Sequence, residues 1–323
     1  MRYWRIIFFL VGALVFLAVI RQIALADFTA FVRTLDWRYA VLAFVSYMGV
    51  NVARVERMTL LIQGKISRRD LFSFVFLQNF LNVFFSFSGD AAYVSLVHRT
   101  KGVPMSENVA SFISAKALDL IVLAGIFFAA VFASASPLLG PFRLPAAVLF
   151  ICVAGVGGFV MARPVAVARG VTSMARTFGI AHGRMARRVL AFISEAARGF
   201  SLLDRRDVFA RVCVWTLINW ACTFLVGWFL LYGVHITLGA GDVLFAYTFP
   251  IAAALTPFYV FGGFGSYEVS FLSGLVLVGI DTLEASRVAV AIHMEELIFL
   301  VVCAAAGLGL QRGYLLRPWK KTN

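Results

Sequence analysis

Long apolar stretches recur along the whole chain and are separated by short polar segments. Runs of about 18 or more apolar residues are typical of transmembrane helices. We place the candidate spans at residues 6–20, 39–53, 71–87, 110–133, 144–162, 208–232, 243–261, 267–280 and 288–311. This pattern predicts an all-α fold, a polytopic membrane helix bundle with about 7–9 apolar segments.

Two of these apolar regions are interrupted by residues that break helices. The region 71–100 is broken at Phe87–Asp90, and the region 243–280 is broken at Gly262–Gly265. Glycine permits tight turns in the backbone. Each region therefore has the form of two shorter helices joined by a bend.

The basic residues are distributed unevenly between the two sides of the predicted membrane. With the N-terminus taken as cytoplasmic, 22 of the 29 Lys and Arg residues fall in cytoplasmic segments and 5 in outer segments. Cytoplasmic loops of membrane proteins carry such an excess. The distribution predicts a multi-pass protein of the cytoplasmic membrane with both termini on the cytoplasmic side.

The same orientation constrains the two broken regions. The basic segments 54–70 and 163–207 are both cytoplasmic, and the spans 110–133 and 144–162 between them already make two full crossings. The region 71–100 must therefore enter and leave from the cytoplasmic side, and 243–280 must do so from the outer side. We expect two re-entrant hairpins, although apolar length alone would also allow full crossings.

Hairpins that enter from opposite sides are a feature of inverted repeats in transporters. The segments 93–96 and 268–271, Tyr-Val-Ser-Leu and Glu-Val-Ser-Phe, each follow a break, although chance similarity explains them equally well. We divide the chain into an N-terminal membrane half (1–162), a basic cytoplasmic linker (163–207) and a C-terminal membrane half (208–323).

The linker is rich in arginine, and apolar residues recur in it at near-helical spacing. Arg184, Arg187 and Arg188 lie mostly off this apolar stripe. One interpretation is an amphipathic helix that rests on anionic lipid of the inner leaflet. The other is a solvated connection between the two halves.

Ionisable side chains at membrane depth are costly and need a partner or a wet cavity. Asp90 follows Gly89 at the first break, where free backbone groups and a carboxylate would frame a headgroup or cation site; a simple helix cap is the alternative.

Lys116 and Asp119 share one helix face. They would either neutralise each other, or Lys116 would meet a lipid phosphate while Asp119 holds it in place.

The string from Pro257 to Glu268 is the most specific in the chain. Pro257 removes a backbone hydrogen bond, and Gly262, Gly263 and Gly265 allow the backbone to turn tightly. Glu268 then falls in the first turn of the next helix, where the helix dipole favours a carboxylate. A packing kink is the alternative to a binding or translocation site.

Near the start of the last span, His293 and Glu296 share a helix face. Together with Glu268 they would form a proton relay, and a water-exposed cluster at the outer end is the alternative. The spacing of the zinc motif H-E-x-x-H is absent.

Composition narrows the classes of protein further. Hydrophobic residues make up 62% of the 323 residues and charged residues only 14%, whereas soluble domains have about 25% charged residues. This excludes a soluble globular enzyme, a disordered chain and a disulfide scaffold. The net charge of +13 reflects the cytoplasmic loops, so we expect no nucleic-acid partner. No catalytic constellation is visible, and we expect neither metal nor cofactor.

The motifs Gly89-Asp90, Lys116-x-x-Asp119 and Pro257…Gly262-Gly263-x-Gly265-x-x-Glu268 resemble the flippase-like family that includes the transmembrane region of lysylphosphatidylglycerol synthase. The resemblance covers essentially the full length. It implies a multi-span bundle with re-entrant segments and a role in lipid translocation or in envelope lipid traffic. The aminoacyl-transfer domain of the synthase is absent from this sequence, so lysyl transfer to lipid is not expected.

The chain departs from the family pattern at three positions. The family often has a basic residue where Tyr93 stands, and Arg where Tyr267 and Lys116 stand. Arginine binds phosphate through two parallel hydrogen bonds, which Lys and Tyr cannot copy. This favours a glycolipid, an isoprenoid carrier or a hopanoid-type lipid over a phospholipid.

From the sequence we therefore expect a lipid translocase whose path is lined by the hairpin residues. A non-transporting membrane partner in envelope lipid assembly and an intramembrane lipid-modifying enzyme are the alternatives. Neither the oligomeric state nor the lipid follows from the sequence.

Overall fold

The computed structural model describes residues 35–84, 88–179, 205–254 and 261–315, with a few isolated positions between 183 and 197. Every regular element in these ranges is helical, so the predicted all-α bundle is confirmed for the described residues. The predicted span 6–20, Pro257 of the predicted bend, and Arg184, Arg187 and Arg188, for which lipid contact was one interpretation, lie outside the described residues.

The described helices follow one another with short connections. In chain order they are α3 (Trp37–Leu61), α4 (Arg68–Phe84), α5 (Ser88–Lys101), α6 (Met105–Ala133), the 3-10 helix η1 (Pro137–Phe142), α7 (Arg143–Ala162), α8 (Pro164–Thr177), α10 (Arg206–Gly233), α11 (Ala240–Ala253), the 3-10 helix η4 (Phe261–Gly263), α12 (Ser266–Leu277) and α13 (Thr282–Leu315).

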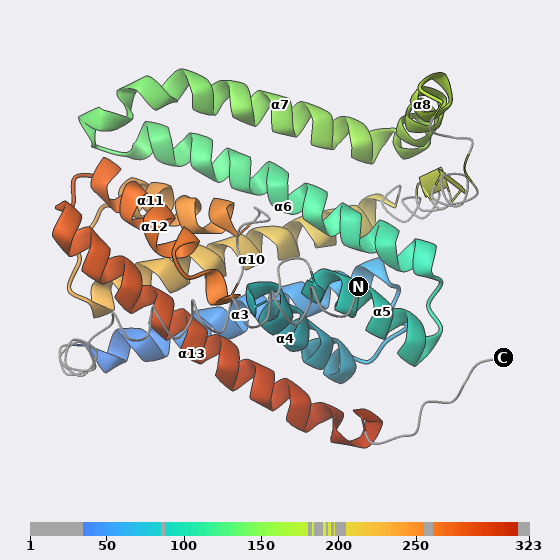
Figure 1. Ribbon diagram of the computed structural model, residues 1–323, viewed down its shortest axis with the longest axis horizontal. Helices are drawn as coiled ribbons and strands as arrows, with labels where there is room; N and C mark the ends of the chain where they lie inside the picture. The colour runs from blue at the N-terminus through green and yellow to red at the C-terminus, as the bar shows by residue number, and fades with distance from the viewer. Residues whose placement is uncertain are drawn as a thin grey trace.

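Four helical segments in the described part of the chain are long and apolar enough to cross a membrane. They are Met105–Ala133, Pro137–Ala162, Arg206–Gly233 and Thr282–Leu310, each of 26–29 residues. A helix of about 20 residues spans the hydrocarbon core. In Figure 1, α6 and α7 run side by side along the long axis of the molecule, and α10 and α13 cross this axis obliquely. The protein is therefore a multi-pass membrane protein.

The helix α3 corrects the predicted boundary of the second span. The sequence prediction ended this span at residue 53 and assigned Arg54 and Arg57 to a cytoplasmic loop. The structure instead continues the helix to Leu61, and Arg57 is buried within the bundle. The prediction was wrong because charged residues were taken as a loop signal. Here α3 packs along the whole of α10 from the other half, and polar side chains on the neighbouring helices receive the charges.

Two pairs of short helices lie between the long ones. The helices α4 and α5 have 17 and 14 residues, and α11 and α12 have 14 and 12. At 1.5 Å per residue the longest of the four extends only about 25 Å, which is less than the ~30 Å hydrocarbon thickness. The α4–α5 pair lies toward one end of the long helices and the α11–α12 pair toward the other (Figure 1).

The inner ends of the two pairs meet. The end of α4 contacts η4, the short turn that precedes α12. A Cβ atom added to Gly262 would lie 3.8 Å from the Phe84 ring at the end of α4. The two interruptions predicted from the sequence are thus neighbours inside the bundle.

The close approach of α5 to α4 depends on one glycine, Gly89. A Cβ atom added at Gly89 would lie 2.0 Å from the backbone oxygen of Gln78 and 2.7 Å from the side-chain oxygen of Asn82. Real Cβ atoms do not approach other atoms so closely, so only glycine allows α5 to cross α4 at this distance. This contact places Asp90, the next residue, directly against α4.

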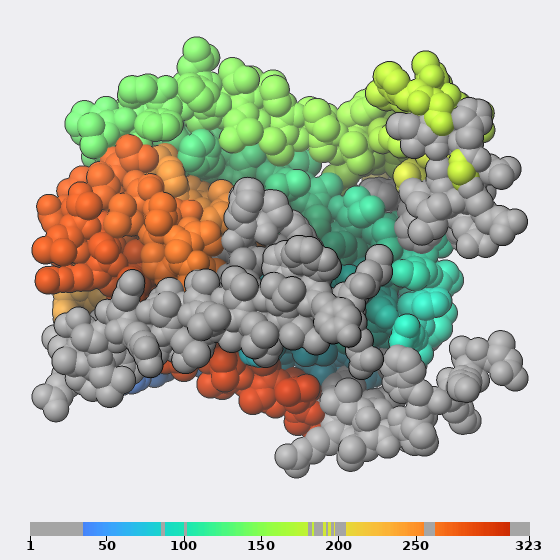
Figure 2. Space-filling view, viewed as in Figure 1, coloured from blue at the N-terminus to red at the C-terminus, as the bar shows by residue number. Residues whose placement is uncertain are grey.

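The helix α7 occupies one edge of the molecule, followed by α8 (Figure 2). Large apolar side chains of α7 are exposed, among them Leu144, Ile151, Val156 and Phe159. Such an apolar face is costly in water and suits contact with lipid chains.

Candidate functional site

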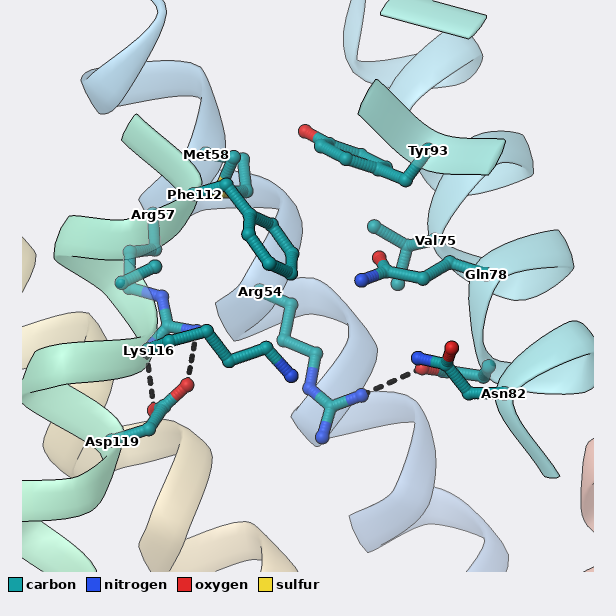
Figure 3. Close-up of a pocket in the computed structure, with 12 residues that line it drawn as sticks. Arg54, Arg57, Met58, Val75, Gln78, Asn82, Tyr93, Phe112, Lys116 and Asp119 are labelled. Carbon is teal, nitrogen blue, oxygen red and sulfur yellow. Dashed lines mark hydrogen bonds and ion pairs between the residues drawn. The ribbon is translucent and has the colours of Figure 1, made fainter. Parts of the chain in front are cut away.

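A small polar cavity lies between α3, α4, α5 and α6 (Figure 3). Its volume of about 80 Å³ is several times the roughly 10–15 Å³ that one water molecule requires. The lining combines cationic, acidic and amide side chains with a few apolar ones: Arg54, Arg57, Met58, Val75, Gln78, Asn79, Asn82, Tyr93, Phe112, Ala115, Lys116 and Asp119.

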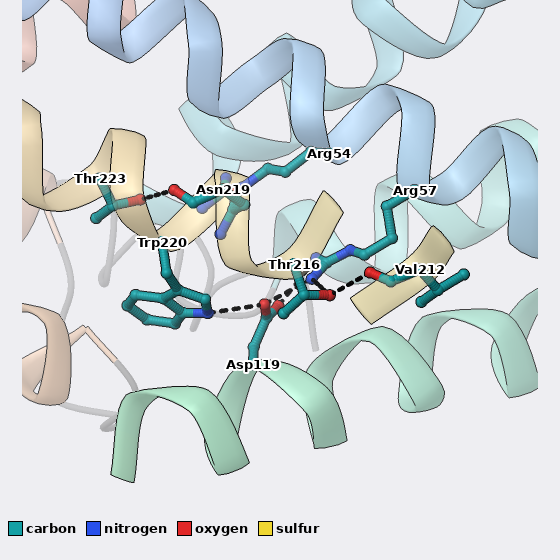
Figure 4. A network of polar contacts seen from close by, with 8 residues as sticks. All are labelled: Arg54, Arg57, Asp119, Val212, Thr216, Asn219, Trp220 and Thr223. Carbon is teal, nitrogen blue, oxygen red and sulfur yellow. Dashed lines mark hydrogen bonds and ion pairs between the residues drawn. The ribbon is translucent and has the colours of Figure 1, made fainter. Parts of the chain in front are cut away.

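A buried ion pair forms one wall of this cavity (Figure 4). Both terminal nitrogens of Arg57 on α3 donate to the carboxylate of Asp119 on α6, at 2.6 and 3.0 Å. Trp220 of α10 donates its indole N–H to the same carboxylate at 3.1 Å, and Arg57 also donates to the Thr216 hydroxyl at 3.2 Å. The pair therefore joins three helices, and its two charges satisfy each other.

Asp90 lies against α4 rather than capping its own helix. Its Oδ1 accepts hydrogen bonds from Gln78 at 2.9 Å and Asn82 at 2.6 Å, and its backbone N–H donates to Asn82 Oδ1 at 3.1 Å. The neighbouring Ser88 donates its hydroxyl to the Leu81 backbone oxygen at 3.2 Å. The two side chains thus tie α5 to α4.

Lys116, which lines the cavity, lies close to Asp90. Its Nζ lies 3.6 Å from Asp90 Oδ2 and 5.3 Å from the centre of the Phe112 ring. The Lys116 side chain is 45% exposed, so the pair is loose. The predicted contact between Lys116 and Asp119 is wrong, because Asp119 pairs with Arg57 and Lys116 pairs with Asp90. Each partner comes from a different helix, which spacing along α6 cannot reveal. The contact of Lys116 with a lipid phosphate stays a prediction.

Arg54 is held by neutral groups. Its Nε donates to the Asn219 amide oxygen at 3.2 Å, and its Nη1 donates to the Asn79 amide oxygen at 2.7 Å. Among the described residues it forms no ion pair with a carboxylate. The cavity thus contains a guanidinium whose charge is solvated by amides but not neutralised.

The sequence analysis missed Arg54 and Arg57 as site residues. Asn51, Arg54 and Arg57 follow an apolar run at intervals of three, which places them on one helix face. That spacing was a usable signal that the helix continues past residue 53, with a polar face directed inward.

A second polar cluster surrounds Glu268 at the start of α12. His293 of α13 contacts Glu268 Oε1 through Nδ1 and the Gly262 backbone oxygen through Nε2, both at 2.7 Å. The Gly265 backbone N–H donates to Glu268 Oε2 at 2.6 Å. As predicted, Glu268 lies in the first turn of α12 after the glycine turn. His293 is 1% exposed, so the alternative of a water-exposed cluster is wrong for this residue.

The hydrogen bonds of His293 define how many protons this cluster holds. A backbone carbonyl can only accept, so Nε2 must carry a hydrogen. The contact between Nδ1 and Glu268 requires a second shared proton. The pair is therefore either imidazolium with carboxylate or neutral imidazole with carboxylic acid, and in both cases its net charge is zero.

The glycine turn adopts the backbone conformation that its sequence suggests. Gly262, Gly263 and Gly265 have φ values of 83°, 78° and 83°, in the left-handed region that other residues rarely adopt. This turn presents the Gly262 carbonyl to His293. Glu296 accepts a hydrogen bond from the Tyr247 hydroxyl of α11, so it anchors α13 to α11.

The structure separates the predicted site residues into two groups. Lys116 and Asp119 line the polar cavity, Asp90 contacts Lys116 and the lining residues Gln78 and Asn82, and Gly89 allows the close packing of α5 on α4. Gly262, Gly263, Gly265, Glu268, His293 and Glu296 belong to the second cluster or its edge. Glu268 forms no hydrogen bond or ion pair with Asp90 or Lys116 in the described part of the chain. The two groups flank the point where the hairpin ends meet.

An apolar groove of about 530 Å³ lies beside the polar cavity. It is lined by residues of α6, α7, α11 and α12, namely Leu120, Leu123, Ala124, Phe127, Leu149, Val153, Thr248, Phe249, Ala252, Ala253 and Ser270. The helix α6 thus lines both hollows: residues 112–119 border the polar cavity, and residues 120–127 border the apolar groove.

The fold and these clusters define a class: a multi-pass helix bundle with broken helices and paired charges in its interior. The family model for the lysylphosphatidylglycerol synthase TM region matches residues 5–305, so the chain belongs to this family of membrane proteins. This confirms the resemblance inferred from the motifs. No curated protein and no solved structure matches the chain.

Proposed function

We propose that this chain is a lipid translocase of the cytoplasmic membrane that moves a lipid headgroup between leaflets without changing it chemically. The observation that carries the proposal is the meeting of the two short helix pairs, with a polar cluster on each side of the contact. Broken helices inside a bilayer are tolerated where they line a cavity or are buried in protein. Membership of a lipid-related membrane family agrees with this role.

In this proposal the two pairs are re-entrant hairpins. The α4–α5 hairpin enters from the cytoplasmic side and the α11–α12 hairpin from the outer side, as an inverted repeat would arrange them. The headgroup passes between the hairpin ends while the acyl chains stay in lipid. The pair of Glu268 and His293 holds the glycine turn through the Gly262 carbonyl, and proton exchange there would release the turn.

The topology can be tested with single cysteines placed at Gly102 and Asp281, in a background without the native cysteines. If both hairpins are re-entrant, a membrane-impermeant thiol reagent will label position 102 from the cytoplasmic side and position 281 from the outer side. Labelling of position 102 from the outer side would contradict the α4–α5 hairpin.

Transport itself can be measured in vesicles that contain the purified protein. Three probes with a fluorescent acyl chain serve: phosphatidic acid, phosphatidylglycerol and glucosylceramide. Dithionite quenching reports the leaflet that each probe occupies. The protein should accelerate the movement of at least one probe over protein-free vesicles. If none of the three moves faster, the proposed function is wrong.

Two substitutions should reduce the rate at least about tenfold, because each removes a carboxyl group next to the contact between the hairpins. Asp90→Asn keeps hydrogen-bonding capacity toward α4 but loses the attraction to Lys116, and Glu268→Gln cannot share a proton with His293. Asp207→Asn, in an exposed pair with Arg211, is the matched control and should leave the rate unchanged. Unaltered transport in both site variants would count against the proposed path.

A further inference from the structure

We propose that the polar cavity binds the phosphate group of a lipid with a compact, terminal phosphate headgroup, while one chain of that lipid lies in the apolar groove beside α6. This inference rests on the proposed function and names the substrate class of the same site. It assigns a role to Arg54 and to the groove that the motifs did not indicate.

The cavity offers more hydrogen-bond donors than the protein uses. A guanidinium has five N–H donors, and Arg54 engages Nε and one hydrogen of Nη1 with amide oxygens, which leaves three. Two further donors on lining residues, the Tyr93 hydroxyl and Arg57 Nε, have no partner but are closed off from water. An acceptor-rich ligand in the cavity would therefore meet the remaining donors of Arg54.

The charges of the site favour an anion. Arg54, Arg57 and Lys116 contribute three positive charges, and Asp90 and Asp119 contribute two negative ones. Asp119 is fully engaged by Arg57 and Trp220, whereas the Lys116 contact to Asp90 is long at 3.6 Å. Lys116 can therefore turn toward a phosphate while Asp90 keeps its hydrogen bonds from Gln78 and Asn82. One unneutralised guanidinium and one mobile ammonium remain for the ligand.

The size of the cavity limits the headgroup. About 80 Å³ accommodates a phosphate group and little more, since a cavity of roughly 10–15 Å³ already holds a water molecule. A sugar or a large amino alcohol would need the walls of the cavity to move apart. We therefore assign the site to lipid phosphates in which the phosphate ends the headgroup.

The groove supplies the place for the chain. Lys116 of the cavity and Leu120 of the groove are one turn apart on α6, which corresponds to a rise of about 6 Å. The faces that line the two hollows are adjacent around the helix at 100° per residue. The groove volume of about 530 Å³ lies within the ~300–1,000 Å³ range of ligand pockets. A single lipid can thus occupy both hollows.

Arg54 also supplies a guanidinium to the site, although the chain lacks basic residues at positions where the family often has them. The sequence comparison disfavoured phosphate because Tyr93, Lys116 and Tyr267 stand where the family often has basic residues. In the folded chain, α3 brings Arg54 to the wall of the same cavity that Tyr93 and Lys116 line. The guanidinium comes from another helix, so the site retains one despite these departures.

The test is a binding measurement on the full chain in detergent, with four probes: dioleoyl phosphatidic acid, dioleoylglycerol, dioleoyl phosphatidylcholine and inorganic phosphate. Native mass spectrometry gives the dissociation constant of each lipid, and competition with phosphatidic acid gives that of inorganic phosphate. We expect phosphatidic acid to bind at least about tenfold more tightly than each of the other three. Equal binding of dioleoylglycerol would overturn the phosphate assignment, and equal binding of inorganic phosphate would overturn the assignment to a lipid.

Matched variants locate the binding. Arg54→Gln should weaken the binding of phosphatidic acid at least about tenfold, and Arg54→Lys should weaken it less. The control Arg211→Gln, in an exposed pair on α10, should not alter binding.

Ala252→Phe fills the groove from an exposed position. It should weaken the binding of phosphatidic acid but not of inorganic phosphate. The control Ala306→Phe, on the exposed surface of α13, should weaken the binding of neither. Unchanged affinity in Arg54→Gln would overturn the site.

The failure of this inference and the failure of the proposed function are distinguishable. Transport of glucosylceramide with unchanged rates in Arg54→Gln would leave a translocase but remove the phosphate site. Tight, Arg54-dependent binding of phosphatidic acid without accelerated movement of any probe would support the phosphate site and reject translocation.

Discussion

Replacing Asp119 with alanine should destabilise the protein by about 3–5 kcal/mol. Arg57 is 4% exposed, and Asp119 is the carboxylate that accepts both of its terminal nitrogens. Without Asp119, the guanidinium stays buried with only the Thr216 hydroxyl as a partner for those nitrogens. The indole N–H of Trp220 would lose its acceptor as well. The free energy of unfolding, from denaturant titration in mixed micelles, measures the loss.

The exposed pair on α10 provides the control for this experiment. Asp207 pairs with Arg211 at 3.1 Å, and both side chains are more than half exposed. Asp207→Ala should therefore leave the free energy of unfolding nearly unchanged, because solvent screens an exposed pair. The double variant Arg57→Met, Asp119→Leu should recover much of the loss, because it removes both buried charges together. An Asp119→Ala protein as stable as the wild type would contradict the buried pair.

Replacing Gly89 with alanine should cost about 3 kcal/mol, the upper part of the range for overpacked interiors. The added Cβ would lie 2.0 Å from a backbone oxygen of α4, which cannot swing aside as a side chain can. The helices α4 and α5 must then move apart. This movement would break the hydrogen bonds from Asn82 and Gln78 to Asp90 and open the wall of the polar cavity. The midpoint of thermal unfolding reports the cost directly.

Gly155 of α7 is the matched control for Gly89. A Cβ atom added there meets no heavy atom within 4 Å. Gly155→Ala should be neutral or should stabilise α7 by up to about 1 kcal/mol, because alanine favours the helical state. If Gly89→Ala and Gly155→Ala have the same unfolding midpoint, α4 and α5 do not cross at the distance described.

Hydropathy and local backbone chemistry were enough to recognise the membrane fold and both interruptions. Glycine at 89, 262, 263 and 265 indicated where the short helices meet: α5 begins at Ser88, and the structure has a turn at Gly262, Gly263 and Gly265. Glu268 was also placed correctly, in the first turn after the glycines. These features depend on residues close together in the chain, so a linear pattern contains them.

The pairing of charges depended instead on contacts between distant segments. Arg57 and Asp119 are 62 positions apart, and His293 and Glu268 are 25 apart. Arg54 was taken for a loop residue because a charge after an apolar run ordinarily marks the end of a span. Two amides contributed by α4 and α10 make its burial acceptable. No pattern within α3 contains that information.

For this protein, the order of apolar and polar residues was sufficient to establish the membrane bundle, the broken helices and the residues that bend them, because burial in lipid and backbone freedom act locally. Only the crossing of the helices in the folded chain determined which acidic residue pairs with which basic residue. It also determined that a polar cavity and an apolar groove lie next to each other along α6. Charges in a low-dielectric interior take the partners that packing brings within hydrogen-bond distance, and packing joins helices that are far apart in the sequence.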